Sequence, residues 1–179
     1  MVISAARFNT YLMLFAALVI AAGCQTVQSK RKKQTAAIRV HLEAFRDGTT
    51  FNELVTIGRS SPMEINVQKT PFLTEDNVAS AKIVDAVGGF GLQIQFDRQG
   101  TMLLEQYSAS NPRKRLAIFS QFGEKLEWAR WLAAPMIYRR IPDGVLTFTP
   151  DADREETAQI ELGLNNHAKA TQPKSEAKE

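Results

Sequence analysis

Few side chains of this sequence have the chemistry of a catalytic or metal-binding group. The 179 residues include one cysteine, Cys24, and two histidines, His41 and His167. A single thiol excludes an internal disulfide and any metal site that needs several cysteines, and neither histidine has a second ligand at metal-binding spacing. We therefore expect no metal, and we expect both histidines to be surface residues.

The motifs of nucleophilic and phosphate-binding enzymes are also missing. There is no G-x-S-x-G segment. The glycine-rich residues 88–91 lack the Lys-Ser/Thr ending of a P-loop and the dinucleotide spacing, so a hairpin turn explains them better. Two of the three acids Asp85, Asp97 and Glu105 could form a carboxylate pair, but acids at strand ends and on a helix are usually solvated. We predict no enzymatic activity, no catalytic residue and no cofactor.

The N-terminal residues have the composition of an export signal. Arg7 is the only charged residue among the first 22, and an apolar run follows it at residues 11–20. The segment from residue 11 to residue 24 would be about 21 Å long as a helix, which is short of the ~30 Å core of a bilayer. These features predict a signal peptide over residues 1–23, cleaved between Gly23 and Cys24.

The residues before the cysteine resemble the lipobox of bacterial lipoproteins. Ala22 and Gly23 match its pattern, whereas Ala21 stands where leucine is commoner. The resemblance implies a diacylglyceryl thioether on Cys24, and two or three acyl chains give a stable anchor. We favour this over an ordinary signal peptide with a chance cysteine. Because Gln25 and not aspartate follows, we expect a lipid-anchored protein that faces the periplasm, on the outer rather than the inner membrane.

Composition divides the remaining chain into three parts. Residues 24–36 carry the basic run 30–33 and read as a polar tether, and we favour a solvated linker over contact with lipid headgroups. Residues 37–165 have the size of one domain. Residues 166–179 contain no large apolar side chain, which predicts a disordered tail. The formal net charge of +3 is too small to indicate nucleic-acid binding.

The hydrophobic pattern of residues 37–165 predicts strands interspersed with a few helices. Apolar and polar residues alternate over 38–42, 64–68 and 92–96, and continuous apolar runs occupy 116–119 and 145–148. Helices are expected after Gly100, at residues 74–77, and after Thr149 as an N-cap, the last fraying at Asn165. We predict an α+β domain, with a mainly antiparallel or mixed sheet and two or three short helices on one face.

Four segments, in their order along the chain, are similar to a known family: 71–78 (PFLTEDNV), 114–119 (KRLAIF), 133–137 (AAPMI) and 146–149 (LTFT). Over about residues 60–165 the chain resembles the head of the first periplasmic domain of SecD/SecDF, a membrane component that helps to complete protein export. Residues 121–123 (QFG) replace the acid–glycine turn of that family. The sequence shows no second long apolar segment, so we do not expect a proton-driven translocase.

The resemblance implies a binding or accessory role, with exported polypeptides or envelope proteins as partners. Tryptophan, tyrosine and arginine are typical anchors of binding surfaces, and an extended segment can add to a strand edge. Such side chains gather in one stretch as Trp128, Trp131, Tyr138, Arg139 and Arg140, together with Arg130. The alternative, which we favour for the two tryptophans, is that they fill the core. The alternative function is a structural envelope lipoprotein with no export role.

Overall fold

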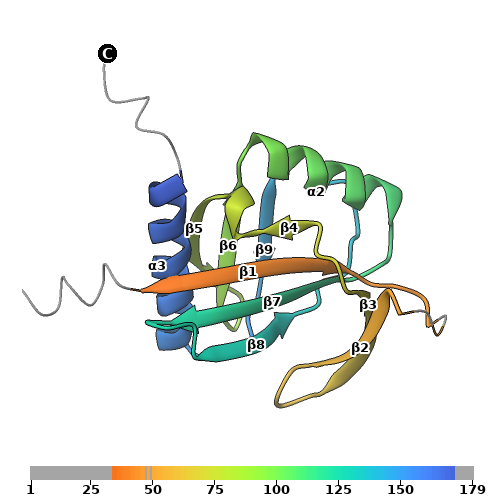
Figure 1. Cartoon of the computed structure of the whole chain (residues 1–179), viewed down its shortest axis with the longest axis horizontal. Coiled ribbons are helices and arrows are strands. Elements are labelled where there is room, and N and C mark those ends of the chain that lie inside the picture. The colour runs from red at the N-terminus through yellow and green to blue at the C-terminus, as the bar shows by residue number, and fades with distance from the viewer. Residues whose placement is uncertain (1–33, 47, 49, 172–179) are drawn as a thin grey trace, which may run out of the picture. The chain divides into compact units, whose positions relative to one another are not determined.

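Strand β1 (Thr35–Leu42) is a central strand of the largest sheet in the computed structural model, which describes residues 34–46, 48 and 50–171. It pairs antiparallel with β7 (Leu116–Gly123) along its whole length. β8 (Trp128–Ala133) continues the sheet beyond β7, and the two-residue β4 (Leu73–Thr74) pairs with the other edge of β1. The order is β4-β1-β7-β8 (Figure 1).

Two further antiparallel sheets complete the strands. β5 (Val78–Ala86) and β6 (Gly89–Phe96) form a hairpin whose turn includes Gly88, as the glycines predict, and β9 (Val145–Phe148) pairs with β6 in the order β5-β6-β9. β2 (Asn52–Ile57) and β3 (Met63–Gln68) form a separate hairpin, seen beside β1 and β7 in Figure 1. The predicted α+β class is confirmed, with three sheets where one was expected.

The helices begin at polar caps. In α2 (Arg98–Ser110) the Asp97 carboxylate accepts the N–H of Gly100 at 2.7 Å, and a capping box closes the 3₁₀ turn η1 (Glu75–Asn77). The last helix, α3 (Arg154–Thr171), contacts mainly β1, β5 and β7 and also β6, and α2 contacts β4 and β6. Between these helices and the sheets lies the main apolar core.

Helix α3 approaches β1 at van der Waals distance. Its buried face repeats at helical spacing: Thr157, Ile160, Gly163, Leu164 and Ala168. A Cβ atom at Gly163 would lie 2.5 Å from the backbone nitrogen of Ala36. The glycine is therefore required by the close contact between helix and strand.

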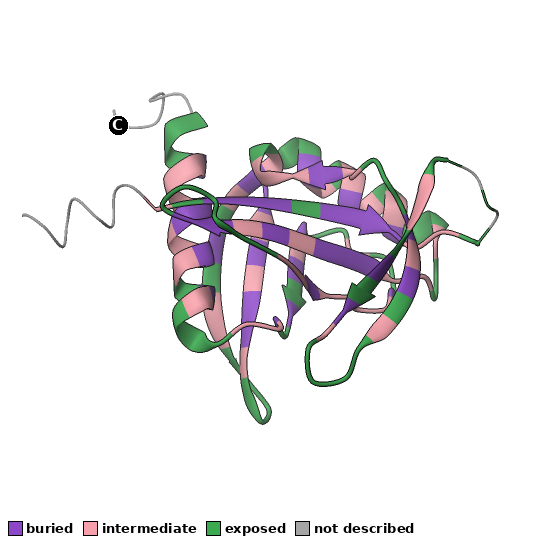
Figure 2. Cartoon of the chain, turned by 60° about the horizontal axis from the view of Figure 1, so that its bottom comes forward, coloured by how far each residue is buried: buried purple, intermediate pink, exposed green. Residues whose placement is uncertain are grey.

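The expectation that His41 is a surface residue is wrong. Its exposed fraction is 5%, because β1 is buried on both faces (Figure 2). The main core covers one face, and the β2–β3 hairpin covers part of the other, forming a second apolar cluster of Val55, Ile57, Ile65, Val67 and Ala117. At His41, the alternation of apolar and polar residues along β1 therefore distinguishes two buried faces of the strand, and not one buried face and one solvent-exposed face.

The boundaries of α3 differ from those predicted. Asp153, not Thr149, caps the helix, because its carboxylate accepts the Glu156 N–H at 2.8 Å while the Glu156 carboxylate accepts the Asp153 N–H at 3.1 Å. The helix also runs to Thr171, so residues 166–171 are not the predicted disordered tail. His167 lies in this extension, with its Nε2 atom 2.9 Å from the Asp76 carboxylate.

The predicted N-terminal boundaries fall mostly outside the described residues. β1 begins at Thr35, two residues before the predicted start of the domain, and the described residues from Gln34 on belong to one compact unit. The predicted signal peptide, Gly23, Cys24, most of the tether (24–33) and residues 172–179 lie outside what the structure describes.

Candidate functional site

The structure divides the predicted aromatic and basic surface between two places. Trp128 and Trp131 lie on β8, whereas Tyr138, Arg139 and Arg140 lie on the connection from β8 to β9. Trp128 is 56% exposed and Tyr138 is 85% exposed. The side chain of Trp131 is half-buried, with its ring centroid 5.2 Å from that of Phe119. The interpretation that both tryptophans fill the core is therefore wrong for Trp128.

Arg130, between the two tryptophans, has a structural role. Its guanidinium donates two hydrogen bonds of 2.8 Å to the carboxylate of Glu156, and a third of 3.1 Å to the carbonyl of Asp151. The bond to Glu156 raises the pKa of Arg130, and the bond from Arg130 lowers the pKa of Glu156. This bidentate pair fastens the first turn of α3 to β8 and leaves Arg130 unavailable for an external ligand.

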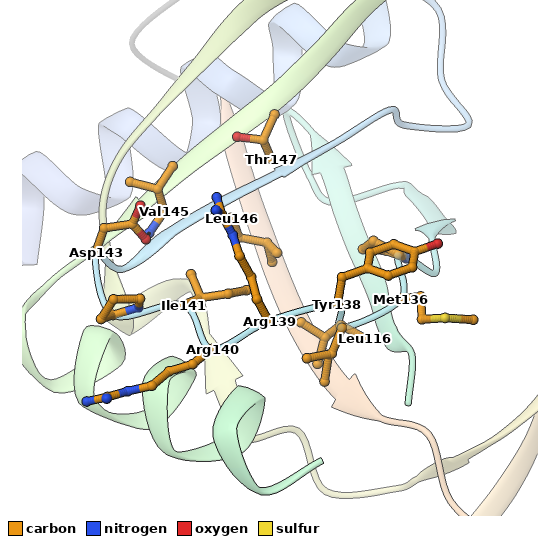
Figure 3. A pocket seen from close by; sticks show the side chains of 13 residues that line it. Leu116, Met136, Tyr138, Arg139, Arg140, Ile141, Asp143, Val145, Leu146 and Thr147 are labelled. Atoms are coloured by element: carbon orange, nitrogen blue, oxygen red, sulfur yellow. Dashed lines mark hydrogen bonds between the residues drawn. The ribbon is translucent and has the colours of Figure 1, made fainter. Parts of the chain in front are cut away.

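A groove of about 640 Å³ lies beside β9. We call it the β9 groove; it is lined by Leu116, residues 135–143 and residues 145–147 (Figure 3). Its size is within the range of ligand-binding clefts. Tyr138, Arg139 and Arg140, three of the five predicted residues, line it; the two tryptophans do not.

Hydrogen bonds to neighbouring elements hold the connection that forms one wall of the β9 groove. Leu116 N–H donates to the Pro135 carbonyl at 2.9 Å, and Ile137 exchanges backbone bonds of 2.8 Å with Arg113 and Lys114. Farther along, Ile141 N–H donates to Ser108 Oγ on α2 at 2.9 Å. The exposed side chains between these points therefore extend from a fixed backbone.

The two arginines of the connection point in different directions. Arg140 extends toward α2, where it pairs with the Glu105 carboxylate (Figure 3). Arg139 rises through the middle of the groove toward Leu146, and no other described residue forms an ion pair with it. Asp143 is engaged locally, because its carboxylate accepts the Val145 N–H at 3.1 Å. Arg139 is thus the cation that the groove presents to a ligand.

The opposite wall of the groove is an open strand edge. Phe96 N–H donates to the Gly144 carbonyl at 2.9 Å, and the register places Leu146 opposite Ile94. Since alternate residues of an antiparallel strand face the same neighbour, Leu146 pairs with β6 while Val145 and Thr147 direct their backbone groups away from it. β9 is the last strand of its sheet.

Three backbone groups of this edge have no partner among the described residues. They are the carbonyl of Val145 and both the N–H and the carbonyl of Thr147, whereas Asp143 caps the Val145 N–H. Thr147 is exposed. The sequence predicts the strand at 145–148 but not its edge position, because nothing in a single apolar run tells which strands flank it.

Neither metal ligands nor a membrane span emerges from the described part of the chain. No group of three or more His, Cys, Asp or Glu side chains there could hold a metal ion. None of the helices among residues 34–46, 48 and 50–171 is long and apolar enough to cross a bilayer.

Comparison with known proteins gives a likeness of fold. No family model matches the chain, and no curated protein matches it. A solved structure of SecDF, described as a membrane component that enhances protein export, matches with a TM-score of 0.52 and 21% identity over 79% of this chain and 67% of that chain. SecDF in its super-membrane-facing form matches with a TM-score of 0.52 and 20% identity over 79% of this chain but only 20% of that chain. The domain therefore has the fold of part of SecDF, as the SecD-head resemblance predicts.

Proposed function

We propose that this chain is a lipid-anchored envelope protein whose α+β domain binds extended polypeptide segments along β9, in an accessory role in protein export. The observation that carries the proposal is the outer edge of β9 beside the β9 groove, where no described residue pairs with the Val145 carbonyl or with the backbone N–H and carbonyl of Thr147. In this proposal the domain binds and does not catalyse, and it needs neither metal nor cofactor.

An extended peptide is the ligand that such an edge recognises. A strand added beside β9 would pair with the Val145 carbonyl and with both backbone groups of Thr147, and its alternate side chains would enter the groove. Main-chain pairing supplies affinity with little dependence on sequence. That property suits a protein that receives many different unfolded chains.

The side chains of the groove add selectivity to this pairing. Apolar residues from the connection, among them Met136 and Ile141, form part of the lining, and Tyr138 stands exposed at its side (Figure 3). Arg139 favours an acidic residue in the bound segment, since it is not neutralised by the described residues. We expect the preferred segment to alternate apolar residues with polar ones and to include a carboxylate.

Two further features support the export role and the location. The fold is that of part of SecDF, which is described as enhancing protein export. The lipobox-like residues before Cys24 and Gln25 after it support an anchor in the outer membrane, facing the periplasm. A structural lipoprotein with no export role is the competing proposal, and it predicts partners that are folded envelope proteins.

A proline substitution separates strand addition from other modes of binding. Thr147→Pro removes one outward N–H and leaves the β6 ladder intact, because proline is tolerated on an edge strand. Thr147→Ala removes the same side chain and keeps the N–H, so it is the matched control. Loss of one backbone hydrogen bond and the bulk of the ring should weaken binding at least about 5-fold.

The probe is an acetylated and amidated peptide in which valine alternates with threonine and one glutamate, and calorimetry measures its affinity. Equal affinities of Thr147→Pro and Thr147→Ala would contradict strand addition. In cells, a photo-crosslinking residue in place of the exposed Tyr138, which leaves Arg139 intact, should trap newly exported, unfolded chains. Capture of folded envelope proteins alone would favour the structural lipoprotein.

A further inference from the structure

A second cavity lies on the face of the four-stranded sheet that bears the β2–β3 hairpin. Its volume is about 350 Å³, and we call it the His41 pocket. It is lined by Arg39, His41, Glu53, Lys69, Pro71, Phe119 and Trp131. None of these residues lines the β9 groove, so the two cavities are separate sites.

Aromatic rings form one wall of the His41 pocket. Arg39, Phe119 and Trp131 occupy one row across β1, β7 and β8. The Trp131 ring is tilted by 59° against Phe119, and it meets His41 edge-on with 5.2 Å between the centroids. Because these rings are inclined to one another, a planar ligand can stack on the face of one of them, such as the Trp131 indole, and meet a neighbouring ring edge-on.

His41 presents a hydrogen-bond acceptor to this pocket. Its Nδ1 atom lies 2.8 Å from the Gln68 carbonyl, which can only accept, so Nδ1 carries the proton. In the neutral ring Nε2 is then an acceptor. No described residue bonds to Nε2, and this atom is not among the side-chain atoms fully removed from solvent, although His41 as a whole is 5% exposed.

The charged residues of the pocket favour an anion. Arg39 and Lys69 are exposed cations with no ion pair among the described residues, and Glu53 is the one acid in the lining. Burial lowers the pKa of His41, which keeps the ring neutral at pH 7. Two cations against one carboxylate leave a surplus of one positive charge, which a single carboxylate on the ligand would balance.

We propose that the His41 pocket binds a small aromatic monocarboxylate that carries a hydroxyl or N–H on its ring. The ring stacks on Trp131 and meets Phe119 at an angle, the carboxylate pairs with Arg39 and Lys69, and the ring donor bonds to His41 Nε2. Glu53 repels a second carboxylate. The binding of this ligand is separate from the binding of peptides at β9.

Three related compounds test each part of the assignment. The probe is 4-hydroxyphenylacetate; phenylacetate lacks the ring donor, and 2-(4-hydroxyphenyl)ethanol lacks the carboxylate. Binding is followed by the NMR chemical shift of the Trp131 indole N–H. The sequence contains one other tryptophan, Trp128, so the Trp128→Phe variant identifies the Trp131 signal. We expect a saturable shift with the probe, and affinities about 5-fold lower for each of the other two compounds.

Arg39 and Lys69 are exposed, so we expect their substitution to leave the fold intact. Arg39→Gln and Lys69→Gln should each weaken binding of the probe about 3-fold to 5-fold, whereas Lys82→Gln, which removes an exposed lysine on β5, should leave it unchanged. The assignment is overturned if the probe gives no saturable shift, or if the alcohol binds as tightly as the carboxylate. If phenylacetate bound as tightly as the probe, the assigned hydrogen bond to His41 Nε2 would be wrong. If Lys82→Gln weakened binding of the probe as much as Arg39→Gln and Lys69→Gln do, the effect of charge would be non-specific and the assignment of these two cations would be wrong.

Discussion

The carboxylate of Glu156 joins three parts of the domain, and its neutralisation should destabilise the fold measurably. It accepts two bonds of 2.8 Å from Arg130 on β8 and one of 3.1 Å from the Asp153 backbone, and the guanidinium of Arg59 lies 3.7 Å away. Glu156→Gln keeps the shape and the capping bond but removes the charge. One end of the amide then presents N–H groups to the guanidinium.

The size of the effect follows from the burial of the pair. The side chains of Arg130 and Glu156 are 20% and 23% exposed, which lies between an exposed pair, worth up to about 1 kcal/mol, and a buried one, worth about 3–5 kcal/mol when broken. We expect Glu156→Gln to lower the free energy of unfolding by about 1.5 kcal/mol. For a domain of this size that corresponds to a fall in Tm of about 6 °C.

Glu155→Gln is the control, because it removes an exposed acid from the same first turn and reports the helix-dipole contribution alone. Denaturant unfolding of both variants gives the difference due to the Arg130 pair. The pKa of Glu156 is lowered in the folded state from its ordinary value of 4.5, so its stabilisation is complete above that pH and is lost as the pH falls through the folded pKa. The wild type and Glu156→Gln should therefore converge in acid. A difference between them that stays constant from neutral pH to strong acid would refute this reasoning.

Three other predictions concern separate parts of the chain. Gly163→Ala should lower the free energy of unfolding by about 2 kcal/mol, measured by thermal unfolding, because the added Cβ would meet the backbone of β1. Gly89 has open space around it, so Gly89→Ala should lower the free energy of unfolding by less than about 1 kcal/mol. Equal losses in the two variants would contradict the close approach of α3 to β1. The NMR titration midpoint of His41 should lie below 6.5 because burial disfavours the charged ring, and a midpoint above that value would show that the imidazole is not desolvated. Cys24→Ser should abolish palmitate labelling and release the protein from the membrane fraction, and unchanged membrane retention would contradict the lipid anchor.

The sequence predicts the position of a strand well where apolar and polar residues alternate regularly. The patterns at 64–68 and 92–96 predict β3 and β6, and the glycines at 88 and 89 predict the hairpin before β6. Periodicity separates the two faces of a strand, but it does not tell whether the face that bears polar residues is open to solvent or covered by another element. For that reason His41 was expected at the surface, although the β2–β3 hairpin and Trp131 bury it.

The end of the chain shows a second limit of hydrophobicity. Residues 166–171 contain no large apolar side chain, yet Ala168 is 2% exposed against the core, and Asn165 Nδ2 donates to the Ala81 carbonyl at 2.8 Å. Small buried residues and side-chain amide hydrogen bonds can therefore continue a helix against a strand beyond its last large apolar residue. Composition alone therefore places the end of α3 too early.

The sequence predicts which residue types form the candidate site, but not how those residues are arranged in space. Tyr138 and Arg139 are exposed at a groove, as residues of a binding surface should be. Trp131 belongs to a different cavity, and Arg130 to the ion pair of α3. These separations depend on strand order and on contacts between distant segments, which neighbouring residues in the sequence do not encode.

Amide hydrogen exchange at Thr147 tests the central claim most directly. In the free protein this N–H faces away from β6 and should exchange fast, whereas the N–H of Leu146, which pairs with Ile94, should already be protected. Saturation with the alternating valine peptide should slow exchange at Thr147 and leave Leu146 unchanged. Peptide binding without added protection at Thr147 would contradict strand addition at the β9 edge.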